Sequence, residues 1–149
     1  STPVQATETS IDQTGIDALR LRQAPYNLLG RKIAIGQVEI GRPGQFGIDK
    51  AANRNPDAVP VTRVFWRDDP AKTDTDVDPH AYSVAGMMIG TAKEVPGVAP
   101  AARLYSAAVG SMEKSGRPEE CLAAQNLALQ NGGDLRAINY SFGESLERD

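Results

Sequence analysis

The sequence is poor in two residue types that carry chemistry, because its 149 residues include one cysteine and one histidine. The lone cysteine, Cys121, excludes an internal disulfide and a metal site built from several cysteines. No apolar run is long enough to span a bilayer. The net charge of −3, with dispersed basic residues, lacks the basic patch of a nucleic-acid-binding or membrane-docking surface. We therefore expect neither nucleic acid nor membrane as a partner.

The length and the 40% hydrophobic content fit one domain with a genuine core. Residues 1–10 are polar and rich in Thr and Ser, which predicts a flexible amino-terminal arm. Residues 11–149 are then the folded part. The sequence itself begins with Ser1 rather than Met, and we interpret this end as processed.

Strand patterns alternate with helix patterns along the folded part. Apolar and β-branched residues predict strands over 32–40, 61–66, 103–109 and 136–143. Apolar spacing and stop signals predict helices over 11–21, from 79 onward, and over 118–130. The Gly- and Pro-rich segment 41–60 predicts a long surface loop. This alternation predicts an α/β fold, with a mostly parallel sheet flanked by helices.

Three side chains, Glu39, His80 and Ser141, fall where parallel sheets gather function, at strand ends and helix starts. Glu39 ends the first predicted strand. Asp78 is a suitable cap for a helix that begins at Pro79, which places His80 in the first turn. Taken singly, Glu39 is more typical of a loop cap or ion pair, and His80 of a structural ring. Together they are two parts of a nucleophile-activating triad.

The acidic loop before this helix contains Asp74, Asp76 and Asp78, which alternate like the start of a calcium loop. Pro79 and Ala85 stand where an EF-hand requires glycine and glutamate. The sequence leaves two alternatives, a solvated acidic loop and a structural calcium site.

Three motifs in order resemble the subtilisin-like serine peptidases, the subtilases, over residues 11–145. PHAYSVAGMMIG, residues 79–90, resembles the histidine helix, whose usual form is His-Gly-Thr-His-Val-Ala-Gly. GVAPAARLYSAAV, residues 97–109, resembles the family's Gly-Val-Ala-Pro turn and following strand. AINYSFG, residues 137–143, resembles the strand beside the substrate that ends in Asn-x-Ser-x-Gly.

The resemblance implies a serine endopeptidase that requires no cofactor. His80 would be its general base, and Glu39 would replace the aspartate of the usual Asp-Ser/Thr-Gly turn, here Glu39-Ile40-Gly41. Asp49 and Asp69 are the fallback acids if the register differs. Glutamate keeps the charge but adds a methylene, so the backbone or side chain must retreat by about one bond.

The resemblance also implies two backbone rails that pair with an extended peptide substrate. Ser141, Phe142 and Gly143 would flank the primary specificity pocket, and Ser115 and Gly116 would form the second rail. Ser141 is not the nucleophile in this interpretation.

The sequence lacks the family's oxyanion asparagine and its nucleophilic serine in a Gly-Thr-Ser-like motif. We therefore expect a cleaved precursor, by autoproteolytic processing, whose companion chain supplies both groups in a heterodimer. We also expect a secreted or periplasmic protein rather than a cytoplasmic one. The alternatives are an inactive subtilase-like binding module and an unrelated doubly wound nucleotide- or metabolite-binding domain, although no GxGxxG turn follows the first strand.

Overall fold

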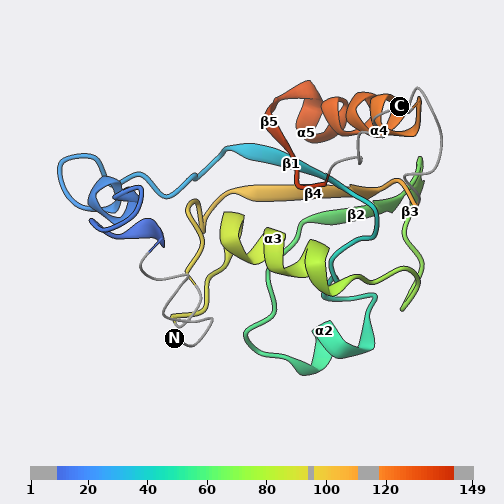
Figure 1. The fold of residues 1–149 in the computed structure, drawn as a ribbon, viewed down its shortest axis with the longest axis horizontal. Coiled ribbons are helices and arrows are strands. Elements are labelled where there is room, and N and C mark those ends of the chain that lie inside the picture. The colour runs from blue at the N-terminus through green and yellow to red at the C-terminus, as the bar shows by residue number, and fades with distance from the viewer. Residues whose placement is uncertain (1–9, 94–95, 111–117, 143–149) are drawn as a thin grey trace, which may run out of the picture.

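The computed structural model describes residues 10–93, 96–110 and 118–142, which contain one five-stranded sheet (Figure 1). The strand order is β3-β2-β4-β1-β5, with bounds β1 Ala34–Glu39, β2 Arg63–Trp66, β3 Asp69–Pro70, β4 Arg103–Ala108 and β5 Leu135–Tyr140. β2, β4, β1 and β5 run parallel, and the two-residue β3 is antiparallel to β2. The predicted α/β fold with a mostly parallel sheet is confirmed.

β1 has neighbours on both edges and is buried on both faces, as its apolar residues predict. Its register aligns Glu39 with Ala108 of β4, and Ala108 with Trp66 of β2. Val38 is aligned with Tyr140 of β5. The carboxyl ends of the four parallel strands therefore meet at one edge of the sheet, where a site is expected.

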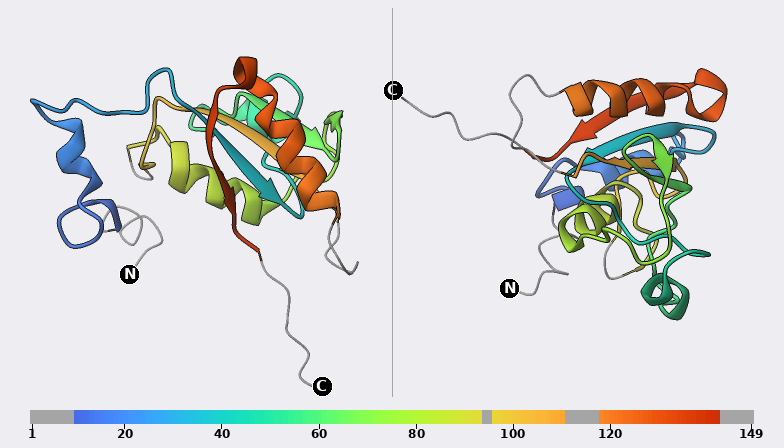
Figure 2. Two further views of the ribbon diagram at one scale, coloured as in Figure 1. Left: turned by 90° about the horizontal axis from the view of Figure 1, so that it is seen from above. Right: turned by 90° about the vertical axis from the view of Figure 1, so that its right-hand side faces the viewer.

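Helices cover both faces of the sheet (Figure 2). α3, Pro79–Ile89, lies with the short α2, Lys50–Arg54, on one side, and α4, Pro118–Ala128, lies with α5, Gln130–Gly133, on the other. Two apolar clusters fill the layers: Val38, Ala107 and Leu127 belong to the α4 side, and Leu104, Ala85 and Ile89 to the α3 side. Such burial is the main stabilising contribution to the fold.

The helix predicted over 11–21 is wrong. The structure has instead a short 3-10 helix, η1 (Ala18–Arg22), preceded by turns, with Asp17 in the left-handed region at φ 56°. The Asp12 carboxylate accepts hydrogen bonds from the Thr14 amide and hydroxyl, and such local bonds compete with helix formation. Because Ile11 is buried while Ile16 is 68% exposed, the apolar spacing does not correspond to one helix face.

Three short elements were not predicted. α2 interrupts the loop expected over 41–60, β3 lies within the acidic segment that follows β2, and α5 continues past residue 130, where the predicted helix ends. The other predicted elements are present with bounds shifted by a few residues. The predicted arm over 1–10 lies almost entirely outside the described residues.

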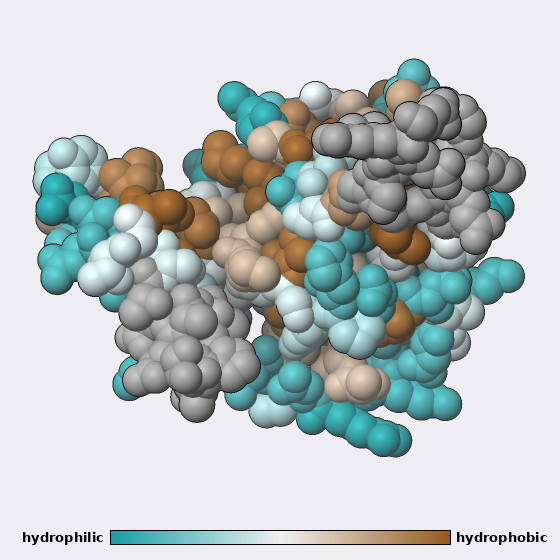
Figure 3. Space-filling model, viewed as in Figure 1, coloured by the Kyte–Doolittle hydropathy of each residue, from teal (hydrophilic) through white to brown (hydrophobic). Residues whose placement is uncertain are grey.

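The surface is uneven in polarity. In the view of Figure 3, hydrophilic residues surround α2, while hydrophobic residues gather toward the amino-terminal segment. That segment exposes large apolar side chains, which include Ile16, Tyr26 and Leu28. None of the helices in the described residues is long and apolar enough to cross a membrane.

Candidate active site

Glu39 lies at the end of β1, on the side of the sheet that α3 covers. Alternation along the strand directs Ile35, Gln37 and Glu39 to the α3 side, and Ala34 and Val38 to the α4 side. The Glu39 side chain is only 1% exposed. A carboxylate in this position needs a partner, because an unpaired buried charge is strongly destabilising.

His80 is placed by the start of α3, whose cap has the predicted form. The Asp78 carboxylate accepts from the His80 backbone N–H at 3.2 Å, and Pro79 occupies the first turn. The His80 side chain is 58% exposed. The helix therefore presents the imidazole at its amino-terminal end, on the side of the sheet's carboxyl edge.

The chain after β1 and the chain before α3 are joined by backbone hydrogen bonds. The Arg42 amide donates to the Asp76 carbonyl at 3.0 Å, and the Asp78 amide donates to the Arg42 carbonyl at 2.7 Å. Gly41 is required at this crossing, because an added Cβ would lie 2.5 Å from the Asp78 Cβ. This close approach brings Glu39 and His80 together across 41 residues of sequence.

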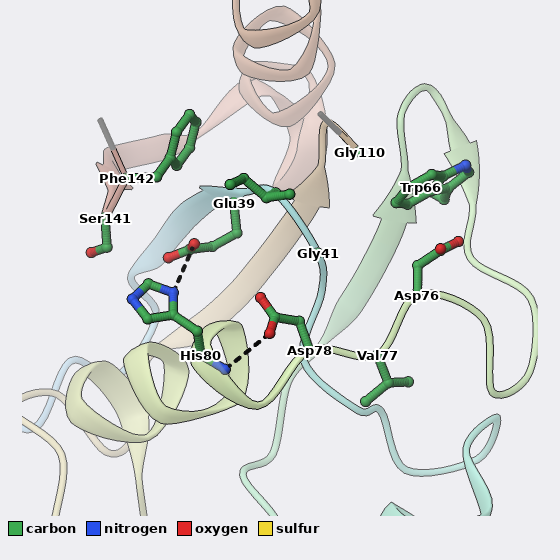
Figure 4. Close-up of a pocket in the computed structure, with 11 residues that line it drawn as sticks. Glu39, Gly41, Trp66, Asp76, Val77, Asp78, His80, Gly110, Ser141 and Phe142 are labelled. Atoms are coloured by element: carbon green, nitrogen blue, oxygen red, sulfur yellow. Dashed lines mark hydrogen bonds and ion pairs between the residues drawn. The ribbon is translucent and has the colours of Figure 1, made fainter. Parts of the chain in front are cut away.

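The two side chains form a direct contact (Figure 4). His80 Nδ1 lies 3.2 Å from Glu39 Oε2, and Nε2 lies on the opposite side of the ring from Glu39. An ionised carboxylate is only an acceptor, so the contact assigns the proton of the neutral imidazole to Nδ1. Nε2 is then an available base that faces outward, which is the arrangement of an acid-oriented general base.

Burial raises the pKa of the Glu39 carboxyl above its ordinary value. The charge and hydrogen bond of His80 oppose this effect, the nearby Asp78 charge adds to it, and the Gln37 amide opposes it. The second oxygen, Oε1, is buried and makes no hydrogen bond within the described residues. His80 is thus the main group that stabilises the ionised form of Glu39.

A cavity of about 530 Å³ opens in front of this pair. Its walls come from the strand ends and the segment before α3, and they include Trp66, Asp76, Gly110, Ser141 and Phe142. Gly110 is at φ 86°, and a Cβ there would lie 2.8 Å from the Trp66 ring. Acidic and aromatic side chains therefore line the cavity together, with Phe142 and Trp66 on opposite sides of Glu39 (Figure 4).

Part of the predicted substrate rail reaches this cavity. Ser141 and Phe142 follow β5 and line the cavity, and Phe142 also packs against the α4-side cluster. The Ser141 hydroxyl accepts a hydrogen bond from the Asn139 amide at 2.6 Å. Gly143, Ser115 and Gly116 lie outside the described residues, so the rest of both rails stays a prediction.

The fallback acids lie elsewhere. Asp49 is buried in an ion pair with Arg42, at 2.8 Å and 2.9 Å between the paired atoms, and Asp69 is exposed in β3. Of the three candidate acids, Glu39 is the one that contacts His80. The added methylene of glutamate is therefore accommodated in this backbone.

The three aspartates of the acidic loop make separate contacts. Asp74 accepts from the Lys50 amide at 3.0 Å, Asp78 caps α3, and Asp76 lines the cavity. The part of the chain that the structure describes holds no group of three or more His, Cys, Asp or Glu side chains arranged for a metal ion. A calcium site stays a prediction.

Two polar residues near the site were missed by sequence reasoning. Gln37 and Arg42 are both fully buried, the first in β1 and the second just after it. A polar residue within an otherwise apolar strand is the available signal for Gln37. Arg42 offers no local signal, because the side-chain partner and the distant carbonyl that it binds come from positions 49 and 72.

The raised pKa of Glu39 predicts a pH-dependent effect of Glu39→Gln on stability. A carboxyl whose pKa is higher in the folded state contributes stability below its unfolded pKa, about 4.3, and that contribution is lost as pH rises through the folded pKa. Glutamine is neutral throughout. The free energy of unfolding of Glu39→Gln, relative to the unsubstituted protein, should therefore increase with pH.

Chemical denaturation of both proteins in their native assembly, from mildly acidic to mildly alkaline pH, measures this difference. Asp68→Asn is the control for removing an exposed carboxylate. A difference that falls as pH rises would show that the environment of Glu39 favours the charge, contrary to this account.

A model of the subtilase family matches residues 5–149. The match includes both members of the Glu39–His80 pair and every strand of the sheet. A search of curated proteins finds no match.

Proposed function

Since the chain belongs to the subtilase family of serine peptidases, we propose that it supplies the acid and the base of a peptidase active site. The observation that carries the proposal is the contact between His80 Nδ1 and the buried Glu39 carboxylate, at 3.2 Å. The family supports hydrolysis of the serine-protease type. It argues against an unrelated nucleotide- or metabolite-binding domain.

In the proposed reaction, His80 Nε2 takes the hydroxyl proton of a serine as its oxygen attacks a peptide carbonyl carbon. Glu39 holds the Nδ1–H and stabilises the imidazolium. The imidazolium then gives its proton to the leaving amine nitrogen, and the C–N bond breaks. Water, activated by the same base, hydrolyses the acyl-enzyme and restores the serine.

The nucleophilic serine and the oxyanion donor come, in this proposal, from polypeptide outside these 149 residues, on a companion chain. No hydrogen bond joins a serine of the described residues to His80. β5 is the last strand on its side of the described sheet, so its outer edge offers backbone donors and acceptors to a further strand. These features support a further segment that completes both the active site and the sheet.

The cavity supports an extended peptide as the substrate. Ser141 and Phe142 continue β5 along one wall, where a substrate backbone could pair with theirs. The proposed rails at Gly143 and at Ser115 and Gly116 would extend this pairing. Backbone groups make this pairing. It therefore sets the position of the bound peptide along the cavity, but it does not set which side chains the enzyme prefers.

A fluorophosphonate probe followed by intact-mass analysis of the native preparation tests the proposal. The label should appear on a serine of a co-purifying chain, and His80→Ala should slow its appearance to a small residual rate. A label on a longer form of this same chain would contradict the companion chain while keeping the acid–base pair. No label at all, in a complete and folded preparation, would overturn the peptidase and assign the chain as an inactive binding module.

A further inference from the structure

A short polar column lies within the apolar layer between the sheet and α3. The Ser106 hydroxyl donates to Gln37 Oε1 at 2.9 Å, and Gln37 Nε2 donates to the Ala81 carbonyl at 2.9 Å. All three residues are fully buried. The column therefore joins β4, β1 and the first turn of α3 through hydrogen bonds that are shielded from water.

The column fixes the orientation of the Gln37 amide. Gln37 and Ser106 are register partners on adjacent strands, and the Ala81 carbonyl can only accept. The amide nitrogen must therefore face α3, and the serine hydroxyl donates to the amide oxygen on the other side. Each polar group in the column is therefore assigned as a donor or as an acceptor, and the hydrogen bonds have a single arrangement.

Gln37 and Glu39 act on the same helix turn from the same strand face. They are two residues apart on β1, about 7 Å along the strand. Gln37 contacts Ala81, and Glu39 contacts the preceding residue, His80. Gln37 reaches the backbone of α3 and Glu39 reaches the imidazole, so the helix start and its side chain are held at two neighbouring points.

We propose that Gln37 is a positioning residue for the Glu39–His80 pair, with Ser106 as its orienting partner. By fixing Ala81, it holds the start of α3 at the separation from β1 that the Glu39 and His80 side chains span together. The Gln37 amide also favours the ionised form of Glu39. The catalytic part of this inference rests on the proposed peptidase function, whereas the positioning part does not.

We expect the column to be removable at little cost in stability, because the Ala81 carbonyl lies inside α3 and keeps a donor from the helix itself. Replacing both partners of a buried hydrogen bond by apolar groups of similar shape is often nearly neutral, whereas removing one partner leaves the other unsatisfied. The informative variant is therefore Gln37→Met with Ser106→Ala. Ile89→Val, at the far end of the same helix, is the matched control for loosened packing.

The direct readout is the Nδ1 proton of His80, observed by NMR in the native assembly with this chain labelled on histidine. His80 is the chain's only histidine, and His80→Ala confirms the assignment. We expect a proton protected from exchange in the unsubstituted protein and in Ile89→Val. In the double variant the proton should exchange faster or lose its signal, with the thermal midpoint close to that of the unsubstituted protein.

Kinetics provide the second readout. The double variant should lower kcat by roughly 10- to 100-fold at nearly constant KM, as small misplacements of reacting groups do. If the protein is active, and the variant leaves kcat and the Nδ1 proton unchanged, the positioning role is overturned and the peptidase stands. If the protein is inactive, a Nδ1 proton altered only in the double variant supports positioning, whereas an unaltered one overturns it.

Discussion

His80→Ala should lower kcat/KM for peptide hydrolysis by roughly 10⁶-fold, and Glu39→Gln by roughly 10⁴-fold. The first change removes the group that accepts the serine proton. The second leaves the ring in place but replaces a pure acceptor, 3.2 Å from Nδ1, with an amide that can also donate and carries no charge. The imidazole then loses its fixed tautomer and the stabilisation of its charged form.

Two further variants sharpen this prediction. Glu39→Asp keeps the charge but withdraws it by about one bond, so we expect a loss of about 10²-fold, smaller than that of Glu39→Gln. Asp69→Asn is the control, because Asp69 is exposed in β3 and should leave the rate within about threefold. An Asp69→Asn loss equal to that of Glu39→Gln would make Asp69 the acid and contradict the assignment.

Asp49→Asn should destabilise the fold by about 3–5 kcal/mol, because it leaves the charge of Arg42 buried without its counterion. The Arg42 side chain is 0% exposed and that of Asp49 is 2% exposed. Burial acts to raise the pKa of Asp49, but the Arg42 guanidinium and the amides of Gln45 and Asp74 outweigh it and lower that pKa. The stabilising contribution of Asp49 is therefore present above its unfolded pKa and lost as pH falls through the folded one.

The Arg42–Asp49 pair also connects the segment after β1 with the segment before α3, and these two segments border the site. Arg42 also donates to the carbonyls of Pro43 and Lys72, so it ties the chain after Glu39 to the chain before His80. Chemical denaturation at neutral pH measures the loss in Asp49→Asn. Replacing both partners, Arg42→Met with Asp49→Leu, should restore only part of it, because no charge is then buried but the Gln45 and Asp74 amides lose their acceptor.

The surface pair Lys50–Asp74 is the matched control for Asp49→Asn. Its atoms are 3.7 Å apart and its side chains are 77% and 41% exposed, so Lys50→Gln should change stability by about 0.5 kcal/mol or less. If Asp49→Asn had an effect that small, the buried pair would not hold the loops together in solution.

The strands and main helices were predictable because their signals are local. Apolar residues mark both faces of β1, and Asp78-Pro79 marks the start of α3 where the structure has it. The expected helix over 11–21 failed because the Asp12–Thr14 hydrogen bonds favour a turn, which apolar spacing does not report. α2 was hidden in a segment whose glycines and prolines predict a loop, and it is only five residues long.

For the site, sequence reasoning found Glu39 and His80 but not the residues that hold them. A strand-end acid and a helix-start histidine have recognisable positions, and the resemblance to subtilases connected them. Gln37 and Arg42 depend on partners at positions 81, 106, 49 and 72, which become neighbours only in the folded chain. No periodicity of the sequence contains that information.

A double-mutant cycle measures whether Glu39 acts through His80. The measurement is the rate of fluorophosphonate labelling in the native assembly, for the unsubstituted protein, both single variants and Glu39→Gln with His80→Ala. Glu39→Gln should slow labelling strongly when His80 is present and have no further effect when it is absent. Equal slowing by Glu39→Gln in both backgrounds would show instead that Glu39 acts independently of the histidine.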